Sequence, residues 1–157
     1  MLSTRQVCEG FHITEAWLRQ LLNLLGVEGP GQGHPRKFSA GEFSMIFVAR
    51  KLITMGAPVP VAVNMALAAG EEFETIALNE GEVGLHRVLL AVPPQEGQVA
   101  WTFTISRKES DTLDILGLDS SAMIAVDLVR SLREALLLQL ELTDRLNNVL
   151  ERHEGEA

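Results

Sequence analysis

Three polar side chains near the N-terminus have the chemistry to read the edges of DNA bases. Leucines that recur at helical spacing predict a helix beginning at Thr14. Four residues share one stripe of that helix, opposite its leucines: Ala16, Arg19, Gln20 and Asn23. Side-chain amides pair with adenine edges, and a guanidinium binds guanine or phosphate. The stripe therefore predicts a helix face that contacts duplex DNA.

Basic residues follow this helix at the end of a loop. The stretch 26–35 contains four glycines and two prolines, so it cannot be a helix or a strand. His34, Arg36 and Lys37 stand where the loop ends. Cationic side chains on such a loop neutralise phosphates without reading the sequence. The alternative is that these residues, and those of the helix stripe, are ordinary solvated polar groups.

Charge is distributed unevenly along the 157 residues. The net charge is −8, which by itself disfavours nucleic acid as a partner. Residues 1–70, however, carry six basic and four acidic residues, whereas residues 71–157 carry seven basic and 17 acidic ones. The first part is able to meet a polyanion that the second part repels. We therefore expect an N-terminal binding domain, followed by a segment with another role.

Catalytic and metal chemistry have little support in the sequence. The four histidines are scattered and none has metal-ligand spacing to another histidine or to the single Cys8, which we expect to be a buried apolar residue. The sequence shows no recognisable set of residues that would activate Cys8 or a serine as a catalytic nucleophile. The run Gly29-Pro30-Gly31-Gln32-Gly33 follows no strand and lacks the Lys-Ser/Thr ending of a phosphate-binding loop. We expect no catalytic site, no metal and no cofactor.

Capping signals and apolar periodicity predict four helices in the first part of the chain. Ser3 or Thr4, Thr14 and the capping box from Ser39 to Glu42 mark three of the starts. The predicted ranges are 4–9, 14–25, 39–55 and 60–70. Trp17 is assigned to the core rather than to a DNA contact, because leucines flank it. The acidic residues that follow Gly70 are expected to form a solvated face: Glu71, Glu72 and Glu74.

The second part of the chain combines strands with one long helix. Apolar runs and alternation predict strands at 88–92, 99–105 and 123–126, with a short helix at 111–118. Asp127 caps a final helix that reaches about Arg152. Along it, apolar positions step by four and three residues, as in a coiled coil, with weaker positions at Ala135 and Gln139. The expected dimerisation residues are Leu128, Leu132, Leu142, Leu146 and Val149. The alternative is that this stripe packs on the sheet of its own chain.

The order of these features in residues 2–70 resembles the MerR family of DNA-binding regulators. Leu2–Cys8 matches the family's first helix, and Leu18-Arg19 matches the Leu-Arg within its recognition helix. Gly33–Phe43 matches its wing and the start of the next helix, and Met55–Pro58 matches its last turn. The chain departs from the family at three places. Gln20–Asn23 stands where the family has two aromatic residues followed by Glu-Arg, and Pro35 adds one residue to the wing. A segment with strands also precedes the long helix, which in the family directly follows the DNA-binding domain. The resemblance implies a winged helix-turn-helix whose second helix enters the major groove.

These observations together predict an α+β fold. An N-terminal four-helix winged helix-turn-helix (1–70) is followed by a small three-strand α/β segment and a long C-terminal helix (71–157).

The expected function is a dimeric, sequence-specific transcriptional regulator that binds double-stranded DNA. Residues 71–157 would form the dimer and would meet a protein partner or a small effector. The alternatives are a phage-type assembly factor (a small terminase subunit or an excision factor) and a protein–protein adaptor. Without a signal peptide or an apolar span, we expect a cytoplasmic protein with no membrane contact.

Overall fold

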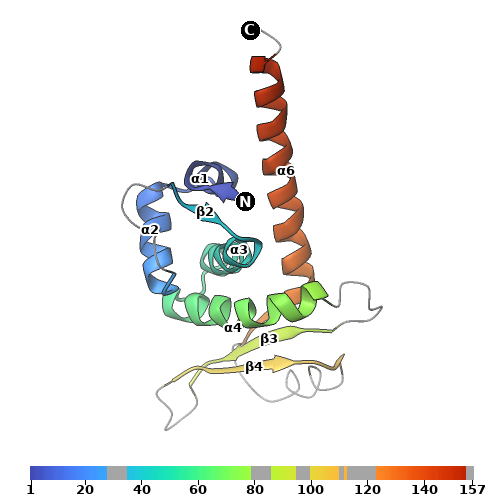
Figure 1. The fold of residues 1–157 in the computed structure, drawn as a ribbon. Helices are drawn as coiled ribbons and strands as arrows, with labels where there is room; N and C mark the ends of the chain where they lie inside the picture. Colours follow the sequence, from blue (N-terminus) through green and yellow to red (C-terminus); the bar gives the residue numbers. More distant parts are fainter. Residues whose placement is uncertain (28–34, 79–85, 95–99, 110–111, 113–122, 155–157) are drawn as a thin grey trace.

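The computed structural model describes residues 1–27, 35–78, 86–94, 100–109, 112 and 123–154, without the side chains of 74, 75, 77, 78 and 146–154. It confirms a mixed α+β fold. The helices are α1 (Thr4–Phe11), α2 (Glu15–Leu24), α3 (Ala40–Thr54), α4 (Val59–Leu78) and α6 (Leu128–Glu154). The strands are β1 (Leu2–Ser3), β2 (Lys37–Phe38), β3 (Val88–Val92), β4 (Thr102–Ser106) and β5 (Ile124–Asp127). Figure 1 shows their arrangement.

The starts of the first three helices are confirmed by their caps. Ser3 Oγ accepts from the amide of Gln6, and the Gln6 side chain accepts from the Ser3 amide, which forms a capping box. Thr14 Oγ1 accepts from the Trp17 amide at 3.2 Å. Ser39 and Glu42 form a second capping box. Each cap satisfies amides that the first helical turn leaves without partners.

Helices α1 to α4 share a core with the short sheet of β1 and β2. The two strands are antiparallel, with Leu2 opposite Phe38. Phe11 and Phe43 stack with their ring centroids 4.8 Å apart, and both are buried. This core fixes the orientation of α2 relative to β2, which carry most of the predicted site.

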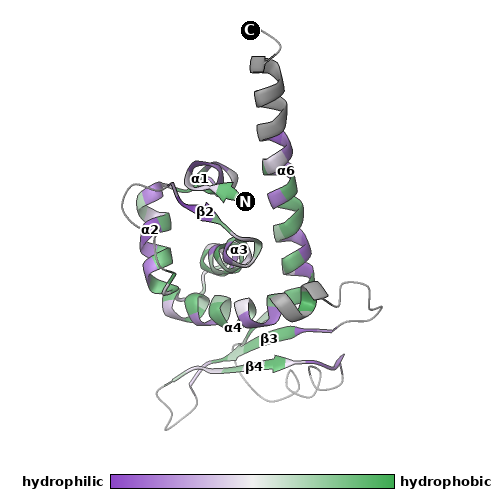
Figure 2. Cartoon of the chain, viewed as in Figure 1, coloured by the Kyte–Doolittle hydropathy of each residue, from purple (hydrophilic) through white to green (hydrophobic). Residues whose placement is uncertain are grey.

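A three-stranded antiparallel sheet lies against α4. Its order is β4-β3-β5, with Leu89 of the central strand opposite Ile105 on one side and Val126 on the other. β3 contains only apolar residues (Figure 2), and Leu89, Leu90 and Ala91 are fully buried. The sequence predicted all three strands within a few residues. The predicted helix at 111–118 lies outside the described residues, apart from Thr112.

Helix α4 continues beyond its predicted end. It runs to Leu78, and Gly70 lies inside it at a point of close helix packing rather than at its end. A Cβ atom on Gly70 would lie 2.5 Å from the sulfur of Met45 in α3. One continuous helix therefore crosses the boundary predicted at residue 70, and reaches the three-stranded sheet (Figure 1).

Glu72 is not part of a solvated face. Its side chain is 9% exposed and forms ion pairs with Arg107 at 2.6 Å and with Arg87 at 3.4 Å. Arg87 directly precedes β3 and Arg107 directly follows β4. The carboxylate therefore ties α4 to both strands. Glu71, one residue earlier, is exposed as predicted.

Helix α6 packs against α1, α3 and the sheet of its own chain, and its far end extends beyond them (Figure 1). Three of the residues predicted for a dimer seam, Leu128, Leu132 and Leu142, are only 0%, 5% and 8% exposed. They are core residues of one chain and not an exposed seam, because α6 folds back on the N-terminal helices. The side chains of Leu146 and Val149 lie outside the described set. Asp127 caps α6 as predicted, accepting from the Arg130 amide at 2.9 Å.

Candidate nucleic-acid interface

Helix α2 divides cleanly into a buried face and an exposed face. Leu18, Leu21 and Leu22 are buried in the core, at 1%, 3% and 7% exposure. The four predicted contact residues are all exposed: Ala16, Arg19, Gln20 and Asn23. The buried leucines hold the helix rigidly, so the exposed side chains project from a fixed backbone. Such a surface suits hydrogen bonding to base edges.

A pocket beside α2 brings two of these residues next to Arg36, which directly precedes β2. It has a volume of about 300 Å³, and its lining includes Arg19, Asn23 and Arg36, together with Thr4 of α1. The structure therefore brings Arg19, Asn23 and Arg36 together around one pocket. Glu15 also lines this pocket and sets a negative charge at its edge.

Arg36 is not the exposed wing cation that the sequence predicted. Its side chain is only 11% exposed, and its Nη2 donates to Glu42 at 3.1 Å. Its guanidinium also lies over the ring of Phe38, 4.8 Å from the centroid. The sequence separation of six residues hid this pair, because the chain turns back between Arg36 and the start of α3. Arg36 therefore fastens the start of β2 to α3.

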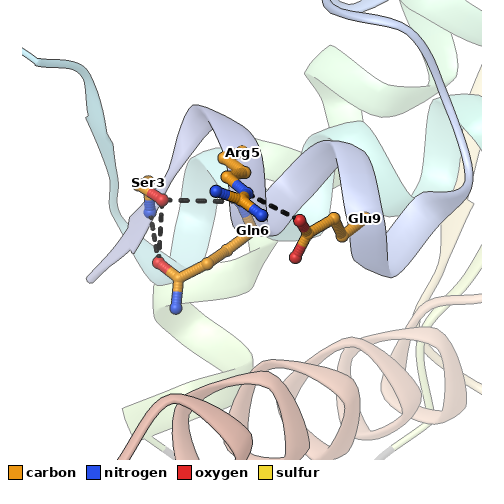
Figure 3. A network of polar contacts seen from close by, with 4 residues as sticks. All are labelled: Ser3, Arg5, Gln6 and Glu9. Carbon is orange, nitrogen blue, oxygen red and sulfur yellow. Dashed lines mark hydrogen bonds and ion pairs between the residues drawn. The ribbon is translucent and has the colours of Figure 1, made fainter. Parts of the chain in front are cut away.

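Lys37 is exposed and lies on a different surface from Arg36. It lines a groove of about 640 Å³ between α1, β2 and α6, which also contains Arg5 and Arg145. Arg5 is 86% exposed and bonds Glu9 at 2.8 Å, as drawn in Figure 3. Arg145 forms an ion pair with Glu141. Three cations therefore converge on this groove, although two of them have partners on their own helices.

The remaining predicted residues are placed as follows. His34 lies outside the described residues. Trp17 is half-buried and packs against the core, as expected. Cys8 is also half-buried; burial, with smaller contributions from Glu15 and Glu9, raises the pKa of its thiol. A raised thiol pKa disfavours the reactive thiolate.

Two exposed residues were not singled out from the sequence, one on α2 and one in the groove that Lys37 lines. Leu24 is 55% exposed and follows Asn23 at the end of α2. Its position four residues after Gln20 could have placed it on the same stripe. Arg5 was not selected either, although it stands just after the Ser3 cap, where an exposed position is expected.

The second part of the structure offers fewer site features. A pocket of about 320 Å³ lies between α3, β5 and the start of α6, lined by residues that include Lys51, Met55 and Arg130. Glu134 accepts hydrogen bonds from Lys51 at 2.6 Å and from Arg130 at 2.9 Å. In the described part of the chain, no group of three or more His, Cys, Asp or Glu residues could hold a metal ion. Among the same residues, no helix has the length and hydropathy needed to cross a membrane.

The chain matches no protein-family model and no curated protein sequence. The chemistry of the α2 surface and the residues around it is therefore the basis for inferring a function.

Proposed function

We propose that this chain is a sequence-specific double-stranded DNA-binding protein that acts as a dimeric transcriptional regulator. The observation that carries the proposal is the exposed face of α2, where Arg19, Gln20 and Asn23 project from a helix anchored by buried leucines. A helix of this kind fits the major groove, and amide side chains there distinguish adenine from the other bases.

The charges around α2 support binding to a polyanion only modestly. Arg19 and Lys37 are exposed, whereas Arg36 is held by Glu42. Each phosphate contact releases counterions, so a small number of contacts gives a shallow dependence on salt. We therefore expect one or two contacts from Arg19 and Lys37, with Arg5 as a further candidate, and a correspondingly large share of specificity from Gln20 and Asn23.

Selection of DNA fragments from random and genomic pools by the full chain tests this proposal. Enriched fragments would then be titrated by fluorescence anisotropy at several salt concentrations. The proposal expects one enriched motif and an affinity tighter than about 10⁻⁶ M at physiological salt, beyond the non-specific range. Absence of enrichment, together with binding no tighter than that limit, would reject it.

A protein-binding adaptor is the second candidate, and Leu24 favours it. This leucine is 55% exposed beside Asn23, where DNA binding needs no apolar side chain. An exposed leucine at the end of a polar stripe also suits contact with a partner helix. The DNA selection described above separates the candidates, because an adaptor should enrich no DNA motif. If a motif is enriched, replacing Leu24 with Ser should change the affinity for it little, because α2 would read bases through its polar residues. A large loss of DNA affinity would place Leu24 in the DNA contact, for example against a thymine methyl group.

A further inference from the structure

The outward face of α6 carries the two most exposed leucines among the described residues. Leu137 is 66% exposed and Leu140 is 61% exposed. They lie three residues apart, so they are neighbours on the helix surface. The opposite face of α6, which includes Leu132 and Leu142, is buried against its own chain. The exposed pair is therefore a separate apolar surface.

Opposite charges flank this leucine pair at equal distances. Arg133 stands four residues before Leu137, and Asp144 stands four residues after Leu140. Both side chains are exposed, and neither has an ion-pair partner within the described part of the chain. The neighbouring charges Arg130 and Arg145 are instead paired with Glu134 and Glu141 on the same helix. Arg133 and Asp144 thus remain available to a partner.

From this symmetric pattern, we infer that a second copy of the chain docks its α6 antiparallel on this face. When two copies cross midway between Leu137 and Leu140, each Leu137 faces the partner's Leu140. The same register places each Arg133 opposite the partner's Asp144, so two ion pairs form. A parallel arrangement would instead place Arg133 against Arg133 and Asp144 against Asp144. Like charges opposed across an interface cost free energy, so the charge pattern favours the antiparallel pair.

The shape of the molecule leaves space for this pairing. Figure 1 shows the N-terminal helices on one side of α6, with the far end of α6 projecting beyond them. From Arg133 to Asp144 the contact spans 11 helical steps, or about 16 Å of helix axis at 1.5 Å per residue. The pairing supplies the dimer of the proposed regulator, and its biological role rests on that proposal. Its existence does not depend on DNA and is tested without it.

Light scattering of the full chain over a concentration series, at low salt, tests the pairing. The wild type should reach the mass of a dimer. Replacing Leu137 and Leu140 together with Glu should give monomers, whereas Leu67→Glu, at an exposed leucine of α4, should leave the mass unchanged. Because both positions are exposed, folding should persist, which circular dichroism would verify. A monomeric wild type, or a double variant that still dimerises, would overturn the inference.

A charge swap tests the antiparallel register itself. Arg133→Asp alone and Asp144→Arg alone each oppose like charges, so each should raise the dissociation constant of the dimer by about tenfold. Combining the two substitutions restores opposite charges only in the antiparallel register, and should return the constant to about the wild-type value. Failure of the combined variant to recover would reject this register. These readouts contain no DNA, so their failure is separate from a failure of the DNA-binding proposal.

Discussion

A Cβ atom built on Gly10 of α1 would lie 2.5 Å from Cδ1 of Leu142 in α6. The two residues are 132 positions apart in the sequence, yet the backbone of one touches the side chain of the other. Leu142 is 8% exposed, and its Cδ1, Cδ2 and Cγ atoms all lie within 3.3 Å of the Cβ position built on Gly10. The first helix and the last helix are therefore packed as closely as a glycine allows.

Replacing Gly10 with Ala should destabilise the chain by about 1–3 kcal/mol, the cost of overpacking a filled site. Gly41→Ala is the matched control, because nothing lies within 4 Å of a Cβ at that helical position. The control substitution should raise the free energy of unfolding by about 0.4–1 kcal/mol. Urea unfolding measures both. In a Leu142→Ala background, Gly10→Ala should no longer destabilise the chain. If the destabilisation is the same in that background, the contact with Leu142 does not cause it.

Replacing Glu72 with Gln should lower the free energy of unfolding by about 3 kcal/mol. This value is at the lower end of the destabilisation expected when a buried ion pair is broken, because only one of the two partners is buried. Arg87 is 16% exposed, whereas Arg107 is 64% exposed. Glu71→Gln, at the exposed neighbouring position, should change stability by less than about 0.5 kcal/mol. Chemical denaturation compares the two variants, and equal effects would contradict the buried role of Glu72.

The ion pair between α3 and α6 should make stability depend on pH. A hydrogen bond from Lys51, opposed by burial and assisted by Arg130, lowers the pKa of Glu134. A carboxyl whose folded pKa is lowered stabilises the fold above its unfolded pKa of about 4.3, and this contribution disappears as pH falls through the folded pKa. The side chain is 35% exposed, so the contribution at neutral pH is below about 1 kcal/mol.

Glu134→Gln measures that contribution. The variant should be less stable than the wild type at pH 7, and the difference should shrink as the pH is lowered past the folded pKa. Unfolding curves at a series of pH values provide the comparison. A difference that persists unchanged at the acid end would show that the carboxylate charge is not responsible.

Arg36 and Lys37 should respond differently to replacement by Ala, although they are adjacent. Arg36→Ala removes the contacts with Glu42 and Phe38, so it should cost roughly 1–2 kcal/mol of stability. Lys37→Ala should leave stability nearly unchanged and reduce the salt dependence of DNA binding by about one phosphate contact. Thermal unfolding and anisotropy titrations separate the two. Equal stability losses would contradict the structural role of Arg36.

Local signals in the sequence predicted the elements well. The caps at Ser3, Thr14 and Ser39 are recognisable because the residue that accepts each hydrogen bond lies within three positions of its donor. The strand β3 was predicted because a short, unbroken apolar run that ends at Pro93 is typical of a buried strand. Leucine spacing in α2 likewise separated its buried face from Ala16, Arg19 and the other exposed residues.

Long-range contacts account for the predictions that failed. Gly70 looks like a helix end in the sequence, and only the proximity of Met45 in the folded chain explains why a glycine stands inside α4. Glu72 looks solvated until the chain brings Arg107 to it from 35 residues away. The spacing of Leu128, Leu132 and Leu142 is the same for packing within a chain and between chains. Sequence spacing therefore identified an apolar face of α6 but not what covers it.

The proposed function requires the exposed amides of Gln20 and Asn23 on α2 to read DNA bases. The most direct measurement is the affinity of Asn23→Ala and Gln20→Ala for the selected DNA site and for a scrambled site, beside the wild type. Each substitution should cost about 1–3 kcal/mol on the selected site and leave binding to the scrambled site unchanged. Both side chains are exposed, so the fold should be unaffected. Equal affinities of wild type and variants for the selected site would contradict the claim.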